Sequence, residues 1–348
     1  MASPPNTQLL RSDPSLGSVI EELWSTALQD STMLTYNSGF KCFKRFASMY
    51  QLYDHTLGLP NINEDILIYF LAYCYHSLHL KYSTIKLYLA GIRFVYIRSG
   101  FDNPLTALNG APFPRIQMLL KSIKKLQGLP KRPRLPVTFD ILENMVDLLR
   151  TGMFGPFTDV MLEAACTLAF FGFLRCGEFT KSKKSKSFLT FGDIKFNEQN
   201  QSFKVILKTS KTDPFRQGVT ITIFKVNHSI CPYRAMHRYC NIMKRYGRQA
   251  SQSLFLTSNN KTLTRTFFVD KIRQILRRLD LNEMHYSGHS FRGGAATSAS
   301  KARIEDHLIR TLGRWSSDCY IRYIDTPISV IKAAQQSLAF TGNLKQKY

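Results

Sequence analysis

The sequence is poor in acidic residues and lacks several patterns that would assign it to common functional classes. It has 24 Asp and Glu against 47 Lys and Arg, which gives a formal net charge of +23. Its seven cysteines include no Cys-x-x-Cys pair, and no Cys/His cluster has metal-ligand spacing, so the sequence predicts no metal centre. No apolar run approaches the roughly 18 residues that a membrane-spanning helix needs.

The N-terminus also lacks the order of a secretory signal. Its first 15 residues are rich in Pro and Ser and show no basic stretch followed by an apolar one. An odd number of scattered cysteines is typical of reduced thiols. We therefore expect a soluble, intracellular protein without a bound cofactor, whose residues 1–15 are disordered.

The basic residues are unevenly distributed along the chain. Residues 1–130 carry 12 basic and 8 acidic residues, whereas residues 131–348 carry 35 and 16. A net charge this far from zero predicts a polyanionic partner, held more strongly by the second part of the chain. The alternative is a protein whose surplus cations are only solvated. A chain of 348 residues is long enough for two domains, each with its own core.

Helical periodicity dominates residues 16–127. Aromatic residues recur at three- and four-residue spacing from Tyr36 to Tyr50, which is typical of a helix with one buried face. Asn63 and Ser83 are suitable N-caps for two further helices, and Pro114 suits the first position of another. The sequence predicts a bundle of four or five helices. Basic residues on its polar faces are candidates for contact with the polyanion, or are only solvated: Lys41, Lys44, Lys86 and Arg93.

Residues 128–137 form the clearest domain boundary. Three prolines disfavour a helix there and favour an extended connector. Lys131, Arg132 and Arg134 make this connector basic. It can therefore lie along a phosphate backbone, although a plain solvated linker has the same composition.

Residues 138–327 combine helices with a small hairpin. An apolar helix is expected over 159–171, and further helices over 233–246 and 266–281. Two runs rich in β-branched residues, 203–207 and 219–224, predict paired strands joined by a basic loop. The predicted fold class is therefore mainly α with a small antiparallel β-sheet.

Five residues suited to phosphate chemistry fall within 35 positions near the C-terminus. They are His289, Arg292, Trp315, Tyr320 and Tyr323. Upstream, Arg175 follows the apolar helix closely, so we expect it to be partly buried and to need an anionic partner. Glu178 is the candidate partner within the protein, and a bound anion is the alternative.

These residue types favour phosphoryl transfer. Guanidinium groups stabilise the charge that spreads over the non-bridging oxygens of a phosphodiester, and a hairpin lysine can join them. A tyrosine can be the covalent nucleophile, and a nearby histidine can transfer a proton. Such a route needs no metal ion, which agrees with the lack of a carboxylate cluster for magnesium.

In their order along the chain, these residues resemble the catalytic set of the tyrosine recombinases, the phage-integrase family. The resemblance covers residues 138–327, and residues 16–127 are similar to the family's core-binding domain. It implies a helical core-binding bundle followed by an α+β catalytic domain. Arg175 matches the first family arginine and Glu178 the acidic position three residues beyond it. His289 and Arg292 match the family's His-x-x-Arg pair.

The remaining positions of the family pattern follow from the same resemblance. Lys211 matches the hairpin lysine, which in the family protonates the leaving 5′ oxygen, and Lys208 is the alternative. Trp315 stands where many members have histidine and others have tryptophan. Tyr323 matches the nucleophile, but its spacing of eight residues after Trp315 is slightly short. Tyr320 therefore remains a second candidate.

The resemblance implies a site-specific recombinase that cuts and rejoins double-stranded DNA through a 3′-phosphotyrosine, without metal or ATP. It also implies a homotetramer on paired DNA sites, in which residues 328–348 form a helix passed to a neighbour; packing on the chain's own domain is the alternative. The sequence around Trp315 and Tyr323 resembles that of family members from eukaryotic mobile elements. This implies a location in the nucleus if the host is eukaryotic. Two rival functions are topoisomerase IB-like relaxation of DNA and DNA-binding regulation without catalysis.

Overall fold

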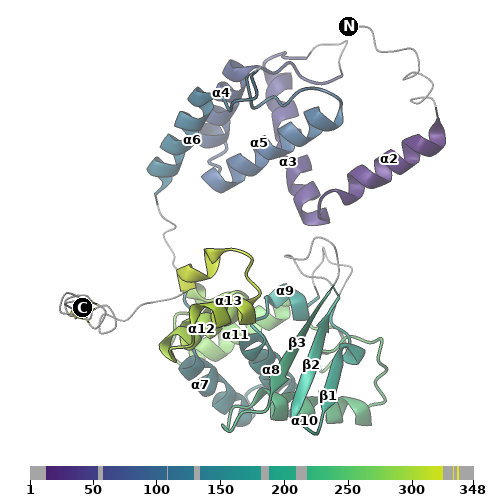
Figure 1. Cartoon of the computed structure of the whole chain (residues 1–348), viewed down its shortest axis with the longest axis vertical. Helices are drawn as coiled ribbons and strands as arrows, with labels where there is room; N and C mark the ends of the chain where they lie inside the picture. Colours follow the sequence, from purple (N-terminus) through teal and green to yellow (C-terminus); the bar gives the residue numbers. More distant parts are fainter. Residues whose placement is uncertain are drawn as a thin grey trace, which may run out of the picture. The chain divides into compact units, whose positions relative to one another are not determined.

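The computed structural model describes residues 13–53, 58–107, 109–128, 134–181, 188–208 and 218–323, together with Lys332, Gln335 and Gln336. The chain divides into two compact units, Met1–Lys131 and Arg132–Tyr348. Figure 1 shows helices in the first unit, and helices with a small sheet in the second. The predicted fold class, mainly α with a small antiparallel sheet, is confirmed.

The first unit is helical throughout its described elements. They are α2 (Pro14–Thr26), α3 (Asp30–Met49), α4 (Glu64–Ala72) with a π-helical extension (Tyr73–Ser77), α5 (Tyr82–Arg98) and α6 (Pro114–Gln127). Because α2 begins at Pro14, it overlaps the segment 1–15 that we expected to be disordered.

Two of the three predicted helix starts are confirmed. Asn63 accepts a hydrogen bond from the Ile66 amide at 2.9 Å, and Pro114 opens α6. The predicted cap at Ser83 is wrong, since α5 already begins at Tyr82. The Tyr82 amide donates instead to Gln127 Oε1 at 2.7 Å, a partner 45 positions away. A long-range contact has replaced the local cap.

Close approach of α3 and α5 builds the centre of this unit. A Cβ on Gly91 of α5 would lie 2.5 Å from the Tyr36 carbonyl oxygen, and one on Gly39 of α3 would lie 2.5 Å from Tyr88 Cα. Only glycine permits such backbone proximity at both points of the crossing. The aromatic stripe of α3 supplies the adjoining core, in which Phe43 and Phe46 are buried. The polar candidates Lys41, Lys44, Lys86 and Arg93 are all exposed.

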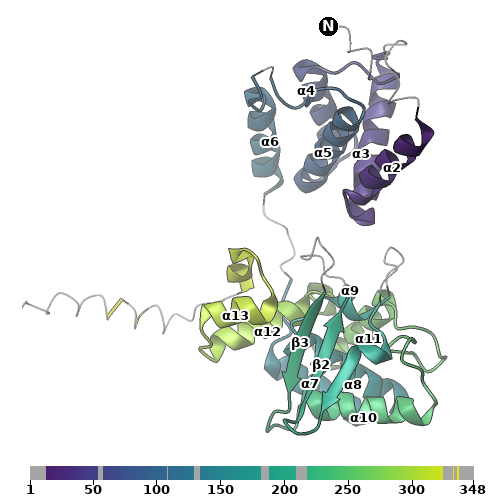
Figure 2. The ribbon, with the colours of Figure 1, turned by 45° about the vertical axis from the view of Figure 1, so that its right-hand side comes forward.

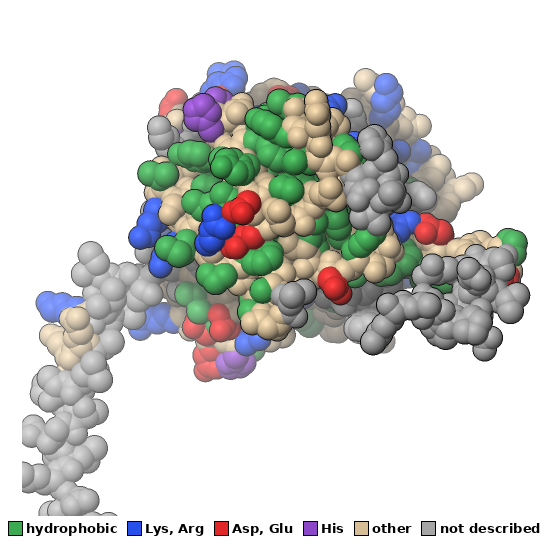
Figure 3. Space-filling view, turned by 90° about the horizontal axis from the view of Figure 1, so that it is seen from above, with side chains coloured by type: hydrophobic (Ala, Val, Ile, Leu, Met, Phe, Trp, Pro, Cys, Tyr) green, Lys and Arg blue, Asp and Glu red, His purple; other side chains and the backbone are tan. Residues whose placement is uncertain are grey.

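The helical unit also has an open apolar groove of about 590 Å³ between α3 and α4. Its lining residues are Phe46, Tyr50, Leu52, Ile66, Tyr69, Ala72, Tyr73, His76 and Ser77. Hydrophobic side chains gather on the face of the molecule seen in Figure 3, with few charged side chains among them.

The second unit packs helices against one face of a three-stranded sheet (Figure 2). Its helices are α7 (Phe139–Arg150), α8 (Pro156–Phe171), α9 (Cys176–Phe179), α10 (Pro232–Arg245), α11 (Arg265–Arg278), α12 (Ser290–Lys301) and α13 (Asp306–Gly313). Its strands are β1 (Ile194–Asn197), β2 (Ser202–Leu207) and β3 (Val219–Phe224), antiparallel in the order β1-β2-β3. Short 3-10 turns cover Phe191–Asp193, Glu283–His285 and Asp318–Tyr323.

The two strands predicted from β-branched runs are confirmed as β2 and β3, with Phe203 opposite Ile223 in the register. The strand β1 was not predicted. It is only four residues long and holds a single fully buried residue, Ile194, so its pattern is too short to detect. Ile223 also approaches the turn after α8, since a Cβ on Gly172 would lie 3.4 Å from its Cδ1.

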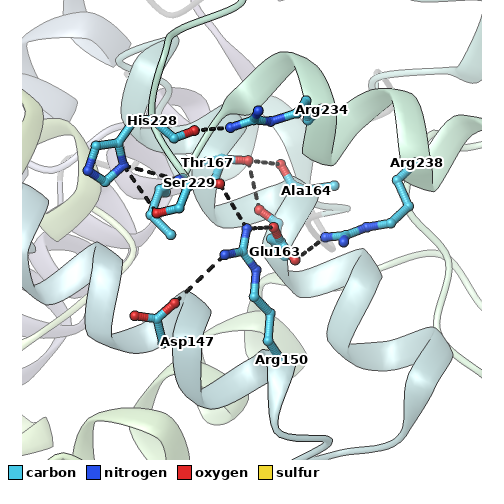
Figure 4. Close-up of polar contacts among 10 residues, drawn as sticks. Asp147, Arg150, Glu163, Ala164, Thr167, His228, Ser229, Arg234 and Arg238 are labelled. Carbon is cyan, nitrogen blue, oxygen red and sulfur yellow. Dashed lines mark hydrogen bonds and ion pairs between the residues drawn. The ribbon is translucent and has the colours of Figure 1, made fainter.

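The apolar helix α8 is the centre of the second unit, and all its residues from Thr158 to Phe170 except Val160 are buried. They include the acidic residue Glu163, whose side chain is only 4% exposed. Its carboxylate accepts from Arg150 of α7 at 2.8 Å and from Arg238 of α10, and Arg150 also donates to the Ser229 carbonyl oxygen at 3.0 Å (Figure 4). A buried carboxylate needs such partners, so this contact fixes α7 and α10 on α8. None of the helices in the described ranges is both long and apolar enough to span a membrane.

Candidate active site

The predicted phosphate-handling residues of the second unit come from four places in the fold. Arg175 is in the turn between α8 and α9, and His289 and Arg292 are at the start of α12. Trp315 follows α13, and Tyr323 ends the last 3-10 turn. The structure brings all five together around the first turn of α12, as the contacts below describe.

Arg292 is the most deeply placed cation of this group, with only 3% of its surface exposed. Its Nη1 donates to the Phe173 carbonyl oxygen at 3.0 Å, and its Nη2 donates to the Gly313 carbonyl oxygen. The guanidinium carbon lies 4.6 Å from the centre of the Trp315 ring, which adds a cation–π contact. Burial, with the charges of Arg175 and Arg314, lowers the pKa of Arg292 to about 10, so it is still charged at neutral pH.

Arg175 and Glu178 form an ion pair beside it. Arg175 Nη1 lies 3.0 Å from Glu178 Oε1, and the Arg175 backbone amide donates to Glu178 Oε2 at 2.9 Å. Both side chains are largely buried, at 18% and 7% exposure. Glu178 thus holds the side chain and the backbone of Arg175 at once, which fixes the direction of the guanidinium.

Trp315 and the two candidate tyrosines pack as one aromatic group. The Trp315 ring centroid lies 5.8 Å from that of Tyr320 and 6.0 Å from that of Tyr323. Tyr320 is buried, whereas Tyr323 is partly exposed. The Tyr323 ring also lies on α12, because a Cβ on Gly293 would be 3.1 Å from its Cδ1. Thr297 Oγ1 donates to the Tyr323 carbonyl oxygen at 2.7 Å, which anchors the turn there.

His289 stands at the solvent-facing edge of the site. Partial removal of its ring from water lowers its pKa below the ordinary value of 6.5, and nearby positive charges lower it further. These charges belong to Arg265, Arg134, Arg175 and Arg292. The imidazole is therefore neutral at neutral pH and able to accept a proton.

Arg134 reaches this position because the chain before α7 runs beside the site. The Leu135 amide donates to the His285 carbonyl oxygen at 2.8 Å, and the Val137 amide donates to that of Ser290 at 2.9 Å. The fit against α12 is close, since a Cβ on Gly294 would lie 1.7 Å from the Val137 carbonyl oxygen. Any larger residue at position 294 would displace this segment.

Three arginines that the sequence analysis did not assign to the site also contact it. Arg314 pairs with Glu178 at 3.1 Å, and Arg265 lies close enough to lower the pKa of His289. Arg310 Nε donates to the Trp315 carbonyl oxygen at 3.2 Å and so supports the turn that carries this ring. The only sequence signal for Arg314 was its place between Gly313 and Trp315, and Arg265 had none.

The comparisons with known proteins find this architecture among solved structures. XerH site-specific recombinase, bound to its difH substrate, matches with a TM-score of 0.61 at 16% identity over 87% of this chain and 78% of its own. The Tn1549 transposon integrase in complex with transposon right-end DNA gives 0.57 at 15% identity over 92% and 99%. A lambda integrase dimer bound to a core site gives 0.52 at 16% identity over 93% and 81%.

The chain has the tyrosine-recombinase fold. The fold implied by the family resemblance is thereby confirmed. In sequence the relationship is distant: no family model and no curated protein matches.

Several residues that the sequence analysis predicted to contact DNA or to act in catalysis are not part of the described site. Lys211, Lys131 and Arg132 lie outside the described residues. Lys208, the alternative hairpin lysine, has its Nζ 2.9 Å from Oδ1 of the buried Asp193, so it is engaged in a different ion pair. Across the described ranges, no group of three or more His, Cys, Asp or Glu could hold a metal ion.

The depressed pKa of His289 leads to a test of the site's electrostatics. Arg265→Met removes a positive charge that opposes protonation of the ring, so the pKa of His289 should rise. Titration of the histidine ring protons by NMR measures this directly. Arg278→Met is the matched control, because it removes the same charge from the other end of α11, about 20 Å along the helix. An unchanged pKa in Arg265→Met, or an equal rise in the control, would contradict the described geometry.

Proposed function

We propose that this chain is a site-specific DNA recombinase that cuts and rejoins strands through a covalent link to Tyr323. The observation that carries the proposal is the grouping of Arg175, Arg292 and Trp315 with Tyr323 in a tyrosine-recombinase fold. Tyr323 is partly exposed, and its ring packs against α12. Two fixed guanidinium groups beside a hydroxyl nucleophile suit a phosphodiester substrate.

The proposed reaction transfers a phosphoryl group twice. Tyr323 Oη forms a bond to the scissile phosphorus as the bond to the 5′ oxygen breaks, which leaves a 3′-phosphotyrosine and a free 5′ hydroxyl. Neutral His289 accepts the tyrosine proton, and Lys211 donates a proton to the leaving oxygen. The 5′ hydroxyl of a partner strand then reverses the step. Because the phosphotyrosine conserves the energy of the broken bond, the reaction needs no ATP.

Charge stabilisation is the main contribution proposed for the arginines. In the transition state, negative charge spreads over the non-bridging phosphate oxygens. Arg175 and Arg292 are held by Glu178 and by backbone carbonyl oxygens, so they need little reorganisation to receive that charge. This role is the one that metal ions have in other phosphoryl-transfer enzymes, and a pair of fixed guanidinium groups can replace them.

Double-stranded DNA is the proposed partner. XerH, the Tn1549 integrase and the lambda integrase were each solved in complex with DNA, and the formal net charge of +23 suits this chain to a polyanionic partner. Further proposed phosphate contacts are Lys41, Lys44, Lys86, Arg93, Lys131, Arg132 and, beside the site, Arg134. That the chain comes from a eukaryotic mobile element and is located in the nucleus stays a prediction, based only on the sequence around Trp315 and Tyr323.

The choice of nucleophile can be tested with a nicked suicide substrate. Wild-type protein should accumulate a covalent adduct on a cognate site, because the cleaved fragment carrying the 5′ hydroxyl diffuses away. Tyr323→Phe should form none, whereas Tyr320→Phe should still form it; denaturing electrophoresis separates the adduct. An adduct that survives in Tyr323→Phe would contradict the assignment.

The same assay identifies one rival function, since DNA binding without any adduct would indicate a regulator. A topoisomerase would also form the adduct, so it needs a separate assay: relaxation of supercoiled DNA by a chain lacking residues 328–348 would indicate topoisomerase chemistry.

The contribution of the helical unit can be tested through salt dependence. Lys86→Ala removes an exposed cation from α5, so affinity for DNA should fall about equally for all sequences. The slope of log affinity against log salt should decrease by about one. Lys121→Ala, an exposed lysine on α6 outside the candidate set, is the control. Unchanged affinity and slope in Lys86→Ala would remove this face from the proposed interface.

Assembly is proposed to depend on α13. Its face toward solvent carries Leu308 and Leu312, both 46% exposed, which is costly for large apolar side chains in water. Apolar positions also recur in the C-terminal segment, which lies almost wholly outside the described residues: Val330, Ile331, Ala334, Leu338 and Phe340. We propose that this segment of one protomer docks on α13 of the next, giving a tetramer on two DNA sites.

Leu308→Glu should break this docking, because it places a charge in an apolar contact. DNA complexes of the variant, and of a chain lacking residues 328–348, should lose the tetramer in analytical ultracentrifugation. His307→Glu, an exposed position about 100° around α13 from Leu308, is the control. A truncated chain that still forms tetramers but unfolds at lower temperature would instead indicate packing on its own domain.

A further inference from the structure

The turn Gly313-Arg314-Trp315 directs its first and last residues to Arg292 and its middle residue to the turn after α8. Arg314 ends α13 in the left-handed region, at φ 54° and ψ 45°, where a non-glycine residue is strained. Gly313 leaves no room for a side chain, since its Cβ would lie 1.7 Å from Trp315 Cζ3. The chain therefore reverses tightly: Gly313 gives its carbonyl to Arg292, and Trp315 packs beside the same guanidinium.

The reversal sends the Arg314 side chain into the turn after α8, where it is only 12% exposed. Its Nη1 donates to the Gly172 carbonyl oxygen at 3.2 Å, and its Nη2 to that of Phe173 at 3.3 Å. The same Nη2 lies 3.1 Å from Glu178 Oε2. Glu178 is thus shared, with Oε1 on the Arg175 guanidinium and Oε2 on Arg314.

This sharing changes the charge that Arg175 presents. A carboxylate paired with one arginine alone forms a neutral pair, which attracts a phosphate weakly. With Arg314 present, the group of Arg175, Arg314 and Glu178 carries one more positive charge than the pair of Arg175 and Glu178 alone. The repulsion between the arginines also acts on Arg292. Burial lowers its pKa most, and the charges of Arg175 and Arg314 lower it further.

We propose that Arg314 is a positioning residue: it divides the Glu178 carboxylate between two cations, so that Arg175 keeps a fixed direction and the group presents one more positive charge to the scissile phosphate. The inference rests on the proposed function and extends it to a residue that itself need not touch the substrate. The competing explanation is that Arg314 only stabilises the turn after α8.

The first experiment compares single-turnover cleavage of the nicked substrate at saturating protein. Arg314→Met should cleave about 10²-fold more slowly than wild type, which is the scale of losing one fixed stabiliser of developing charge. On a substrate with an uncharged methylphosphonate at the scissile position, the ratio of wild-type to variant rates should fall to below about tenfold. A purely structural defect would leave the two ratios equal and would overturn the proposal.

The matched control for this experiment is Arg303→Met. Arg303 is also an arginine in the left-handed region, at φ 58°, but it is exposed. Its replacement removes the same formal charge from the same backbone conformation, and because Met also carries a Cβ, the left-handed strain is unchanged in both variants. It should leave both cleavage rates within about twofold of wild type. A loss equal to that of Arg314→Met would overturn the proposal by showing a general effect of charge.

A second variant tests whether Arg314 acts through Glu178. Glu178→Gln combined with Arg314→Met returns the net charge of the site to its wild-type value. The double variant should therefore cleave at least about tenfold faster than Arg314→Met alone, a non-additive result expected for residues that share a contact. A double variant as slow as the single one would contradict the proposed route.

The last measurement does not require cleavage. In a Trp24→Phe background, Trp315 is the only tryptophan, and its fluorescence can report binding of inorganic phosphate beside Arg292. Arg314→Met should bind phosphate about tenfold more weakly, and Arg314→Lys, which keeps the charge, should recover most of the loss. If wild type forms no covalent adduct, the proposed function fails, yet this titration still decides the role of Arg314: equal affinities would overturn it.

Discussion

Burial of the Arg292 guanidinium is the constraint on which the arrangement of the second unit depends. A charge with 3% exposure is tolerated only if the fold replaces the water it has lost. Here the replacement comes from carbonyl oxygens after α8 and at the end of α13, and from the Trp315 ring. Elements more than a hundred residues apart are therefore held against one cation, and the proposed site forms where they meet.

Small residues make this convergence possible. Gly294 lets the segment before α7 lie directly on α12, and Gly313 lets Trp315 fold back over its own helix end. Gly172 leaves room for the Leu168 carbonyl oxygen, from which a Cβ would lie only 2.8 Å, at the turn whose carbonyl oxygens serve Arg292 and Arg314. In each case a Cβ would occupy space that a backbone or ring atom already fills. The site is thus supported by close packing as much as by hydrogen bonds.

Local patterns predicted what depends on local physics. The aromatic stripe of α3, the cap at Asn63 and the two β-branched strands were all visible, because period and capping act within a few residues. The prediction of a cap at Ser83 was wrong because α5 begins one residue earlier, where Gln127 of α6 accepts the hydrogen bond from the Tyr82 amide. For the same reason Arg314 and Arg265 were missed, since only the folded chain brings them to Glu178 and His289.

The sequence by itself determined the fold class, the mixture of a helical part with a basic α+β part, and the residue types suited to phosphate chemistry. These follow from composition, periodicity and order, which do not depend on long-range contacts. Tertiary structure alone decided how the charges are distributed: Glu178 serves two arginines, Lys208 is engaged by Asp193, and Tyr320 is buried while Tyr323 is not. Distance and burial set these interactions, and neither can be read from position in the chain.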